Sequence, residues 1–547
     1  MAGLLVNRGH VELDAAEVFL DPRLTRLVAP GLLRGMDAAV GAIIAAFTSG
    51  KRVTIYGDYD VDGMTAASVL TRFFRALGWE PHVFLPDRFV DGYGLNPDRV
   101  RELAEGGTRL FISVDCGVTA VSAIGIARGL GADFVVVDHH QPPDGELPPA
   151  TAIVNPHQAG CTFPFKDLCA AGLAFYVALG VRAALRDRGF FVDRPEPDVR
   201  ELLDLVAIGT IADVVPLVGL NRVLVTAGMA RMERSPHVGV RALTALTAKG
   251  GRLTAKTVAY QMGPRLNASG RLSHPFKGFE LLTTDDAAVA RRIGDDLEAE
   301  NKSRQDLQKE IEVEAVALAE EDGQDAPAYV LWKDGWHAGV TGIVAARIVE
   351  RYHRPCAMVA VTDGIGKGSI RSIRGFDAVA GLRRCADTLD QYGGHPFAAG
   401  LTVQEGRLAD FKAAFQAAAL SLTAPEHLVP ELRIDAEVGF AAIDDRLVAE
   451  LDHLAPFGAG NAEPLLCTLG ARVMDAKRVG DGSHLKLTLT EGGRRFGAIA
   501  FGMGDRAPES GALIDVAFRP EINEYNHQVS LQLRVVDLRP CVSGASP

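Results

Sequence analysis

Aspartate and histidine side chains stand at the ends of apolar runs in this chain, where they can bind metal ions. The tripeptide Asp138-His139-His140 comes directly after the apolar residues 134–137, and Asp115 comes directly after residues 110–114. Charged side chains are rarely buried unless they are paired or bound to metal. A carboxylate and two imidazoles at the end of a buried strand therefore predict a metal site rather than part of a hydrophobic core.

Two further acidic sites occupy similar positions, one after the apolar residues 53–55 and one after residues 205–212. Their aspartates are Asp58, Asp60, Asp62 and Asp213. In open parallel sheets, ligands bind beyond the carboxyl ends of the strands. At least three of the four acidic sites lie at predicted strand ends, so we expect them to converge on one crevice.

Such a crevice can perform phosphoryl chemistry. Two divalent ions about 3.5–4 Å apart can hold an attacking hydroxide and neutralise charge on a phosphoryl group. Asp60 and Asp62 stand two residues apart, so a tight loop lets them reach different ions, and Gly63 permits that loop. Imidazole ligands favour manganese, whereas magnesium prefers oxygen.

The order of the four motifs resembles the DHH phosphoesterase superfamily, whose members hold two divalent ions, usually Mn²⁺ or Mg²⁺. By this resemblance Asp60 and Asp62 serve one ion each, Asp115 bridges the ions, and His139 and Asp213 complete the ligand shells. Asp58 and Asp138 are either further ligands or orient an imidazole. His140 is expected to take part in catalysis by facing the phosphate.

One position departs from simpler members of the superfamily, which often carry a histidine four residues before the first liganding aspartate. Here that position is Tyr56. The first ion is therefore expected to take more carboxylate or water ligands.

Two glycine-rich segments further along the chain have the composition of anion-binding sites. Residues 366–372 include Ser369 and Arg371 between glycines, and Gly393-Gly394-His395 lies in the second segment. Glycines let backbone N–H groups approach an anion, and arginine can clamp a phosphate with two hydrogen bonds. Together with residues 336–344, the second segment resembles the DHH-associated domain, which closes over the active site.

Three more segments resemble the RecJ family of bacterial exonucleases, a resemblance that runs from about residue 20 to 540. They are residues 85–94, residues 263–271, interpreted as a glycine-flanked loop, and residues 455–464. Arginine with tyrosine or phenylalanine suits single-stranded nucleic acid, because the cation binds phosphate while the ring stacks on a base. The candidate substrate-binding residues of the first two segments are Arg88, Tyr93, Arg265, Asn267 and Arg271.

Composition constrains the class of protein. The 547 residues are 48% hydrophobic and 23% charged, which predicts a globular chain of about three domains. Seven cysteines with no Cys-x-x-Cys pair suit a reduced cytoplasm. We expect no membrane span, because there is no apolar run of about 18 residues, and no signal peptide is evident. The net charge of −12 does not exclude a nucleic-acid partner, because residues 295–322 alone hold eleven Asp or Glu against three Lys or Arg.

The pattern along the chain predicts an α/β fold. Alternating short apolar runs and helical segments in residues 53–156 indicate βαβ units and a parallel sheet. The predicted organisation is a parallel-sheet DHH domain with an N-terminal extension (1–284), a long polar connecting helix interpreted as solvent-bridging (285–322), a smaller α/β DHH-associated domain (323–428) and a C-terminal OB-fold β-barrel (429–547).

As the RecJ resemblance implies, we expect a 5′ to 3′ exonuclease that digests single-stranded DNA to 5′-mononucleotides in recombinational and mismatch repair. The implied partners are single-strand-binding protein and a RecQ-type helicase, and a monomer is expected. One alternative is a DHH phosphodiesterase acting on nanoRNA or cyclic dinucleotides, which generally lacks the barrel. Another is a non-catalytic DNA-binding scaffold, which would need to have lost metal ligands.

Two substrate contacts follow as hypotheses. A 5′-phosphate pocket is expected from Arg88, Arg265, Ser369 and Arg371, with Arg271 as a competitor for the place of Arg265. A basic barrel face is expected from Lys477, Arg478, Lys486, Arg494 and Arg495. Such a face would bind phosphates in a salt-sensitive manner.

Overall fold

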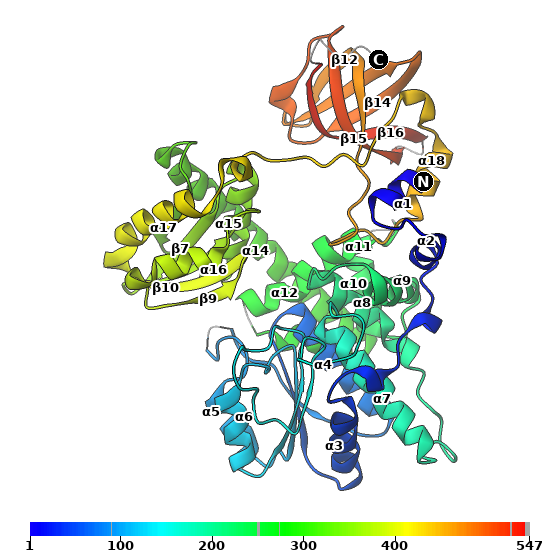
Figure 1. Cartoon of the computed structure of the whole chain (residues 1–547), viewed down its shortest axis with the longest axis vertical. Helices are drawn as coiled ribbons and strands as arrows, with labels where there is room; N and C mark the ends of the chain where they lie inside the picture. Colours follow the sequence, from blue (N-terminus) through cyan, green and yellow to red (C-terminus); the bar gives the residue numbers. More distant parts are fainter. Residues whose placement is uncertain (89, 249–251, 273, 526–527, 542–547) are drawn as a thin grey trace.

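The computed structural model describes residues 1–88, 90–248, 252–272, 274–525 and 528–541. Figure 1 shows a lower lobe that contains the N-terminal half of the chain, a second lobe beside it, and a barrel at the top. The chain crosses between the lobes through one long helix and reaches the barrel through an extended segment. The N-terminus lies beside the barrel rather than in the lower lobe.

The first lobe is built on a parallel sheet with strand order β2-β1-β3-β4-β5. Its strands are β1 (Val53–Gly57), β2 (His82–Phe84), β3 (Leu110–Val114), β4 (Asp133–Val137) and β5 (Ala152–Val154). The apolar runs 53–55, 110–114 and 134–137 that were predicted to be strands are confirmed as β1, β3 and β4, and the parallel sheet is confirmed. Their side chains are mostly buried, as in parallel sheets whose two faces are both covered.

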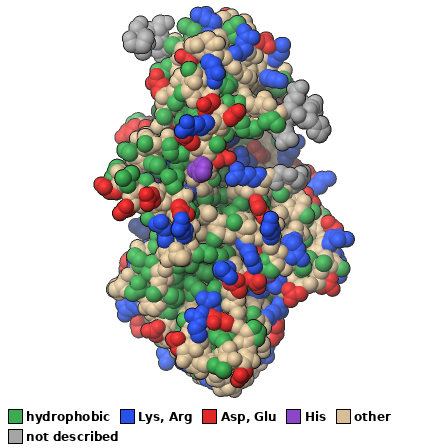
Figure 2. All heavy atoms as spheres, turned by 90° about the vertical axis from the view of Figure 1, so that its right-hand side faces the viewer, with side chains coloured by type: hydrophobic (Ala, Val, Ile, Leu, Met, Phe, Trp, Pro, Cys, Tyr) green, Lys and Arg blue, Asp and Glu red, His purple; other side chains and the backbone are tan. Residues whose placement is uncertain are grey.

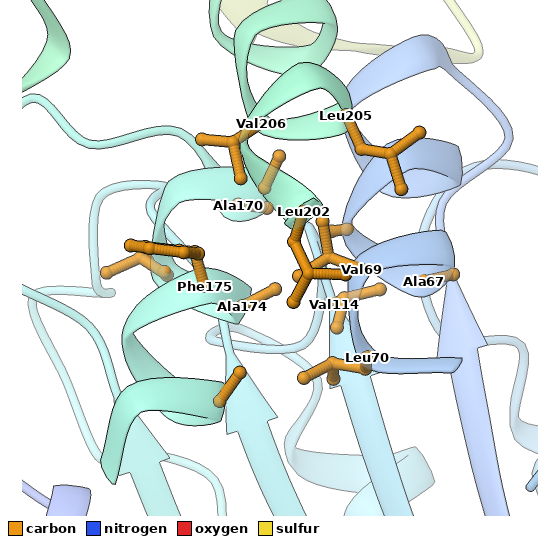
Figure 3. Close-up of a cluster of buried hydrophobic side chains, with 14 of the residues drawn as sticks. Ala67, Val69, Leu70, Val114, Ala170, Ala174, Phe175, Leu202, Leu205 and Val206 are labelled. Carbon is orange, nitrogen blue, oxygen red and sulfur yellow. The ribbon is translucent and has the colours of Figure 1, made fainter. Parts of the chain in front are cut away.

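Helices cover both faces of this sheet and extend the lobe. They are α3 (Met36–Thr48), α4 (Val61–Ala76), α5 (Pro97–Glu105), α6 (Val121–Gly129), α7 (Ala170–Asp187), α8 (Leu203–Ala212), α9 (Gly219–Met232), α10 (Val238–Ala248), α11 (Ala255–Thr257), α12 (Gly263–Leu272) and α13 (Phe276–Thr283). Figure 3 shows α4, α7 and α8 meeting over the sheet, with Val69, Phe175 and Val206 among the buried side chains between them. This packing fixes the ends of β1 and β3 relative to α7 and α8.

The connecting helix α14 (Ala287–Asp322) is confirmed, but its interpretation as a solvent-bridging helix is wrong. Its first half packs against α10, α12 and α13, and its second half packs against α15 (Ala338–Tyr352) and β6 (Tyr329–Asp334). Asn301 and Arg304 are buried between these two contacts. The polar sequence hides this packing because each half of the helix buries only a few side chains, the first half against the first lobe and the second half against the second lobe.

The second lobe contains a mixed sheet of order β6-β7-β8-β10-β9. Its remaining strands are β7 (Cys356–Thr362), β8 (Ile365–Arg371), β9 (Gln391–His395) and β10 (Ala398–Gln404), and its other helices are α16 (Ala378–Arg384) and α17 (Leu408–Leu422). Only β6 and β7 pair in parallel, and the other neighbours are antiparallel. Both glycine-rich segments of this lobe therefore lie in strands, β8 and β9.

The C-terminal strands form a barrel of order β11-β12-β13-β14-β16-β15, closed by pairing of β12 with β15. They are β11 (Ala436–Glu437), β12 (Leu466–Val479), β13 (His484–Glu491), β14 (Arg494–Ala500), β15 (Leu513–Tyr525) and β16 (Gln528–Pro540), preceded by α18 (Asp445–Asp452). The barrel core also takes in Leu4, Leu5 and Phe19 from α1 (Ala2–Asn7) and α2 (Leu13–Leu20). The predicted fold class, two α/β lobes joined by a helix and followed by an OB barrel, is confirmed.

The prediction of a glycine-flanked loop at residues 263–271 is wrong, because these residues form α12. This helix continues without a break from α11 through a π-helical turn at Val258–Met262, so Pro264 lies directly after an irregular turn of one longer helix. The two arginines of the segment therefore project from a rigid helix.

Among the described residues, no single helix is long and apolar enough to cross a membrane. One bent pair, residues 24–32 with α3, passes on length and composition alone. In this structure α3 packs on the sheet and α7.

Candidate metal centre and phosphate pocket

Four acidic or imidazole sites meet at one edge of the first sheet. The carboxyl ends of β1, β3 and β4 are followed by Asp58, Asp115 and Asp138, and the C-terminus of α8 is followed by Asp213. The run before Asp213 is thus a helix rather than a strand, yet its end reaches the same edge. We call Asp58, Asp60, Asp62, Asp115, His139 and Asp213 the strand-end cluster.

Within this cluster Asp60 and Asp62 belong to different groups of potential ligands. Ligand atoms of Asp58, Asp60 and Asp115 lie within 4.8 Å of one another, and so do those of Asp62, His139 and Asp213. Asp60 is the N-cap of α4, and its Oδ1 accepts hydrogen bonds from the amides of Asp62 (2.9 Å) and Gly63 (3.1 Å). The other carboxylate oxygen of Asp60, Oδ2, takes no part in this cap and can therefore bind a cation.

The carboxylate of Asp62 is fully buried and held by the N-terminus of α7. Its oxygens accept hydrogen bonds from the amides of Ala170 (2.6 Å) and Ala171 (2.9 Å). Burial nevertheless raises the pKa of Asp62 to about 7, and repulsion from Asp60 adds to the rise. Gly63 allows the first turn of α4 to approach the end of β1 closely, because a Cβ there would lie 2.6 Å from backbone atoms of Asp58.

Asp115 lies where both groups meet. Its Oδ1 is 3.2 Å from His139 Nε2, and its backbone has φ +65°, an uncommon conformation for a residue other than glycine. Such strain is often found at functional sites, where the surrounding structure enforces it. Burial, followed by repulsion from Asp60 and Asp62, raises the pKa of Asp115 well above its ordinary value.

His139 is available as a neutral ligand. Burial lowers its pKa to about 4, and the neighbouring His140 adds to this effect, so the ring is uncharged at neutral pH. Its Nε2 lies 3.6 Å from Asp213 Oδ2 and 3.8 Å from Asp62 Oδ2. Burial and repulsion from Asp62 raise the pKa of Asp213 to about 9.

The donor set fits divalent cations. Asp58 Oδ1, His139 Nε2 and Asp213 Oδ2 are buried, yet they make no hydrogen bond with any described residue. Buried polar atoms are normally satisfied, so each points to a missing partner. Close carboxylates with pKa values raised by burial and repulsion are the arrangement that a bound cation would relieve. The first group contains carboxylates only, which suits the expectation drawn from Tyr56.

Tyr56 itself lies away from this cluster. It packs with Phe84 on the other side of the sheet, and its hydroxyl accepts a hydrogen bond from the amide of Asn96 (3.2 Å). Tyrosine at this position therefore serves the core.

His140 faces the space between the two lobes. Its Nδ1 pairs with Asp138 Oδ1 (2.8 Å), its Nε2 lies 3.1 Å from the hydroxyl of Tyr93, and its ring centre is 6.0 Å from that of His395. Burial opposes protonation, but the hydrogen bond and charge of Asp138 outweigh it, so the pKa of His140 is raised.

The oxygens of Asp138 are directed away from the strand-end cluster. Besides His140, this carboxylate accepts a hydrogen bond from the amide of Val118 (2.9 Å). Burial works against the ionised form, but these hydrogen bonds lower the pKa of Asp138. Of the two roles left open for Asp138, orienting an imidazole matches this geometry.

A second concentration of charge lies between the lobes, and we call Arg88, Arg271, Arg304 and Arg371 the arginine pocket. Burial lowers the pKa of Arg271 to about 10, and Arg88, Arg304 and Arg371 lower it further by repulsion. Arg88 lies over the ring of Tyr59, 5.4 Å from its centre. Grouped guanidinium groups of this kind suit a phosphate anion.

The two candidate arginines of α12 are separated by the structure. Arg265 pairs with Glu298 and donates to the carbonyl of Gln261 (2.8 Å). Arg271 reaches the second lobe, where it donates to the carbonyl of Gly339 (2.8 Å). Arg271 therefore lies in the arginine pocket, whereas Arg265 is held by α14. Asn267 lies between them, half-buried on α12.

The second lobe completes the pocket with a groove of about 460 Å³ beside β8. Its lining includes Arg88, Thr341, Lys367, Ser369 and Gly393. The groove lies against the first turn of α15, and helix N-termini attract anions.

Glycines keep this part of the second lobe open. A Cβ at Gly342 would lie 3.0 Å from Arg371 Nη2, and at Gly394 it would lie 2.5 Å from Ala399 Cα. Phe89, within the segment of Arg88 and Tyr93, lies outside the described residues.

The basic residues predicted for the barrel do not form one face. Lys477 on β12 lies directly opposite Lys486 on β13. On the next strands the register places Ile499, then Arg534 and then Arg519 in the same row. We call Lys477, Lys486, Arg534 and Arg519 the basic row. Arg494 and Arg495 instead lie at the far end of β14, about 13–17 Å along the strand from Ile499.

Charges of both signs are mixed over the face of the barrel seen at the top of Figure 2. Within the basic row, Arg534 and Arg519 are both paired with Glu463. Lys477 and Lys486 are exposed, although Lys477 also pairs with Asp475 (3.0 Å). The exposed basic charge of the row is therefore concentrated on β12 and β13.

Sequence reasoning missed several residues of these sites. Arg304 has no local signal, because it lies in a helix full of charges. Tyr59 and Lys367 lie within the recognised motifs but were not selected. An aromatic residue inside an Asp-x-Asp motif, and a lysine beside Ser369, were the signals available.

Three family models match the chain in order. They are the DHH family, N-terminal domain (residues 52–210), the DHHA1 domain (residues 325–420) and the RecJ OB domain (residues 434–537). Each falls on one of the three folded units described above.

Proteins named single-stranded-DNA-specific exonuclease RecJ are similar to almost the whole chain. The Bacillus subtilis protein is 35% identical and the match covers 98% of this chain and 67% of that protein. The Escherichia coli protein is 36% identical, with 93% of this chain and 91% of that protein covered. The crystal structure of Thermus thermophilus RecJ in complex with Mn²⁺ superimposes with a TM-score of 0.85 at 34% identity, covering 100% of this chain and 77% of that one. A Mg²⁺ complex from the same organism gives a TM-score of 0.77 at 32% identity, covering 99% of this chain and 74% of that one.

Proposed function

The chain belongs to the RecJ family, and on that premise we propose that it is a single-stranded-DNA-specific exonuclease working in the 5′ to 3′ direction and releasing 5′-mononucleotides. The observation that carries the proposal is the convergence of the strand-end cluster and the arginine pocket on one space between two lobes. A candidate metal centre thus lies beside a candidate phosphate site.

The strand-end cluster would hold two divalent ions. The similar Thermus structures are complexes with Mn²⁺ or Mg²⁺, which supports these metals as the candidates. Asp58 and Asp60 would serve one ion, Asp62, His139 and Asp213 the other, and Asp115 both. When bound, such ions supply positive charge toward a phosphoryl group and activate water for attack. The hydrogen bonds on Asp60 and Asp62 keep their carboxylates in place before any ion arrives.

His140 would act on the substrate rather than on an ion. Asp138 fixes its ring and raises its pKa, so the imidazole can donate a hydrogen bond to a phosphoryl oxygen. His395 approaches it from the second lobe, and Tyr93 from the first. Closing of the lobes would therefore complete the contacts to the scissile phosphate.

The arginine pocket supports the direction of digestion. A terminal 5′-phosphate carries more negative charge than an internal phosphodiester, and a half-buried group of arginines favours that extra charge. Arg88, Arg271 and Arg371 would bind it with Ser369, while the barrel holds the strand further along. Such an activity would serve recombinational and mismatch repair, in which a single strand has to be removed.

The test is digestion of single strands labelled at either end, in the presence of Mn²⁺. A 5′ label should appear at once as a mononucleotide with no intermediate lengths, while a 3′ label should give a ladder of shortening strands. The reverse pattern would assign the opposite polarity. Internal cuts in both strands would show an endonuclease, and hydrolysis of dinucleotides alone would favour a DHH phosphodiesterase of small substrates.

A further inference from the structure

The loop that carries Asp213 has a strained backbone. Val214, the next residue, has φ +61°, which costs free energy for a β-branched side chain. Its side chain is 69% exposed, so packing of that side chain does not explain the conformation. Strain of this kind persists only where neighbouring structure enforces it.

The residues that follow Val214 contact a part of the chain more than two hundred residues away. Residues 453–461, between α18 and β12, lie against residues 214–218. The amide of Leu217 donates to the carbonyl of Ala459 (2.7 Å). A Cβ at Gly460 would lie 2.9 Å from Pro216 Cβ, and one at Gly458 would lie 2.7 Å from Leu217 Cδ1.

The distant loop is itself held firmly. Arg222, which is 2% exposed, donates to the carbonyls of Leu454 (2.9 Å) and Ala455 (2.8 Å). Its guanidinium group also donates a hydrogen bond to the backbone carbonyl of Phe19 (2.7 Å) and lies over the ring of that residue. These bonds join α9 of the first lobe to the N-terminal segment and the barrel.

A second group of bonds closes the loop on itself. Asn461 donates to the carbonyls of Leu454 (2.8 Å) and Pro456 (2.9 Å) and accepts a hydrogen bond from Arg8. The loop therefore has a fixed shape where it meets residues 214–218.

We propose that residues 453–461 are a positioning element for Asp213, so that the metal centre is fully formed only when the barrel is docked on the first lobe. The loop fixes Pro216 and Leu217, these hold Val214 in its strained conformation, and that conformation aims the Asp213 carboxylate at the strand-end cluster. This inference rests on the proposed role of Asp213 as a metal ligand. It assigns to the barrel region a second task besides holding DNA.

The experiment compares Gly460→Ala with Gly470→Ala. Both glycines have nearly the same backbone, φ +68° and +65°, so alanine adds similar strain at both. Only at Gly460 does the added methyl group press on Pro216, because at Gly470 a Cβ would meet no described atom within 4 Å. Mn²⁺ binding is measured directly from the electron paramagnetic resonance signal of the free ion, together with affinity for single-stranded DNA and thermal unfolding.

Gly460→Ala should weaken binding of at least one Mn²⁺ about threefold or more relative to Gly470→Ala. DNA affinity and unfolding temperature should match between the two variants, and saturating Mn²⁺ should restore the hydrolysis rate. Equal Mn²⁺ affinities in the two variants would overturn the inference. If Gly460→Ala does not fold, Gly458→Ala takes its place, since its methyl group presses on the side chain of Leu217 (Cδ1 at 2.7 Å, Cγ at 3.1 Å) and not on backbone atoms.

Asp213→Ala separates this inference from the proposed function. It should lose one Mn²⁺ site outright. If Asp213→Ala binds Mn²⁺ like the wild-type protein, the ligand role is wrong and the inference falls with it. If Asp213→Ala loses the ion but Gly460→Ala behaves like Gly470→Ala, only the positioning role is wrong.

Discussion

The strand-end cluster and the basic row of the barrel hold their charges in opposite ways. The first gathers buried carboxylates whose charges repel, on a backbone strained at Asp115 and Val214. The second places lysines in water on regular strands, where their charge costs little. Chemistry on a phosphate requires fixed groups in a dry site, whereas holding a strand requires only charge that can follow it.

The arginine pocket lies between these extremes. Its guanidinium groups are partly buried and repel one another, and an anion bound among them would relieve that repulsion. We therefore expect the effect of a substitution to fall from the strand-end cluster, through the arginine pocket, to the basic row.

The largest effect is expected for Asp115→Ala. Loss of the shared carboxylate should lower hydrolysis more than about tenfold, because metal-centre contacts are worth several kcal/mol, while DNA affinity changes little. Rates and affinities are measured on the same labelled strand. Asp133→Ala, at the opposite end of β4, is the matched control and should keep the wild-type rate. An Asp115→Ala protein with more than about a tenth of that rate would contradict the bridging role.

A smaller and more selective effect is expected for Arg371→Ala. Removing a charged hydrogen bond to a terminal phosphate should slow digestion of 5′-phosphorylated strands about tenfold or more. Strands ending in a 5′-hydroxyl should be affected much less. Arg374→Ala, exposed and close by in sequence, should not discriminate between the two ends. Equal losses on both substrates would reassign Arg371 to general contact with the backbone of DNA.

Removing the metal should make stability depend on pH. Asp62 and Asp213 have folded-state pKa values of about 7 and about 9, above the value of about 4 for an unfolded aspartate. A raised pKa favours the folded state at low pH, and that contribution is lost as pH rises through the folded-state value. In EDTA the unfolding temperature should therefore fall between about pH 5.5 and about pH 8, and Mn²⁺ should raise it most at the higher pH.

Thermal unfolding at both pH values, with and without Mn²⁺, checks this expectation. Asp62→Asn cannot ionise at that position and should show a weaker pH dependence in EDTA. A gain from Mn²⁺ that is the same at both pH values would mean that the carboxylates are not strained by their charge in the folded protein.

The smallest effect is expected in the barrel. The double variant Lys477→Ala with Lys486→Ala should reduce the slope of log affinity against log salt by about 1.4, if each lysine neutralises one phosphate of a single strand. The hydrolysis rate on short strands should not change. The control removes the same charge from the first lobe, through Lys51→Ala with Arg101→Ala. An unchanged slope would leave the barrel with only its structural role.

Deleting the barrel is not an informative version of this experiment. Leu4, Leu5 and Phe19 belong to its core, and Arg222 donates to carbonyls just before β12. Truncation would expose the N-terminal helices and leave Arg222 without acceptors, so lost activity would not report on DNA binding.

Local patterns in the sequence were enough to predict the first sheet and its acidic edge. A parallel strand is a short apolar run, and the residue after it lies at the ligand-binding edge whatever the rest of the fold does. For that reason Asp58, Asp115 and Asp138 were found without any tertiary information. The same reasoning placed Asp213 among the candidates, although the run before it is a helix.

Sequence patterns failed to predict the local structure where polar and apolar residues do not alternate clearly along a segment. Residues 263–271 contain glycine, proline and arginine and were interpreted as a loop, yet packing against α14 makes them a helix. The acidic connecting helix was interpreted as a solvent-bridging helix between two lobes, yet each of its halves packs against one lobe.

By itself the sequence determined which residues can do chemistry and which strands carry them, because both depend on near neighbours in the chain. The tertiary structure alone decided which arginines share a pocket, since Arg88, Arg271, Arg304 and Arg371 come from four separate segments. It also brought Ala459 to Leu217, a contact with no local signature. The docking of one lobe on another depends on the shape of whole surfaces, and the spacing of residues along the chain does not encode that shape.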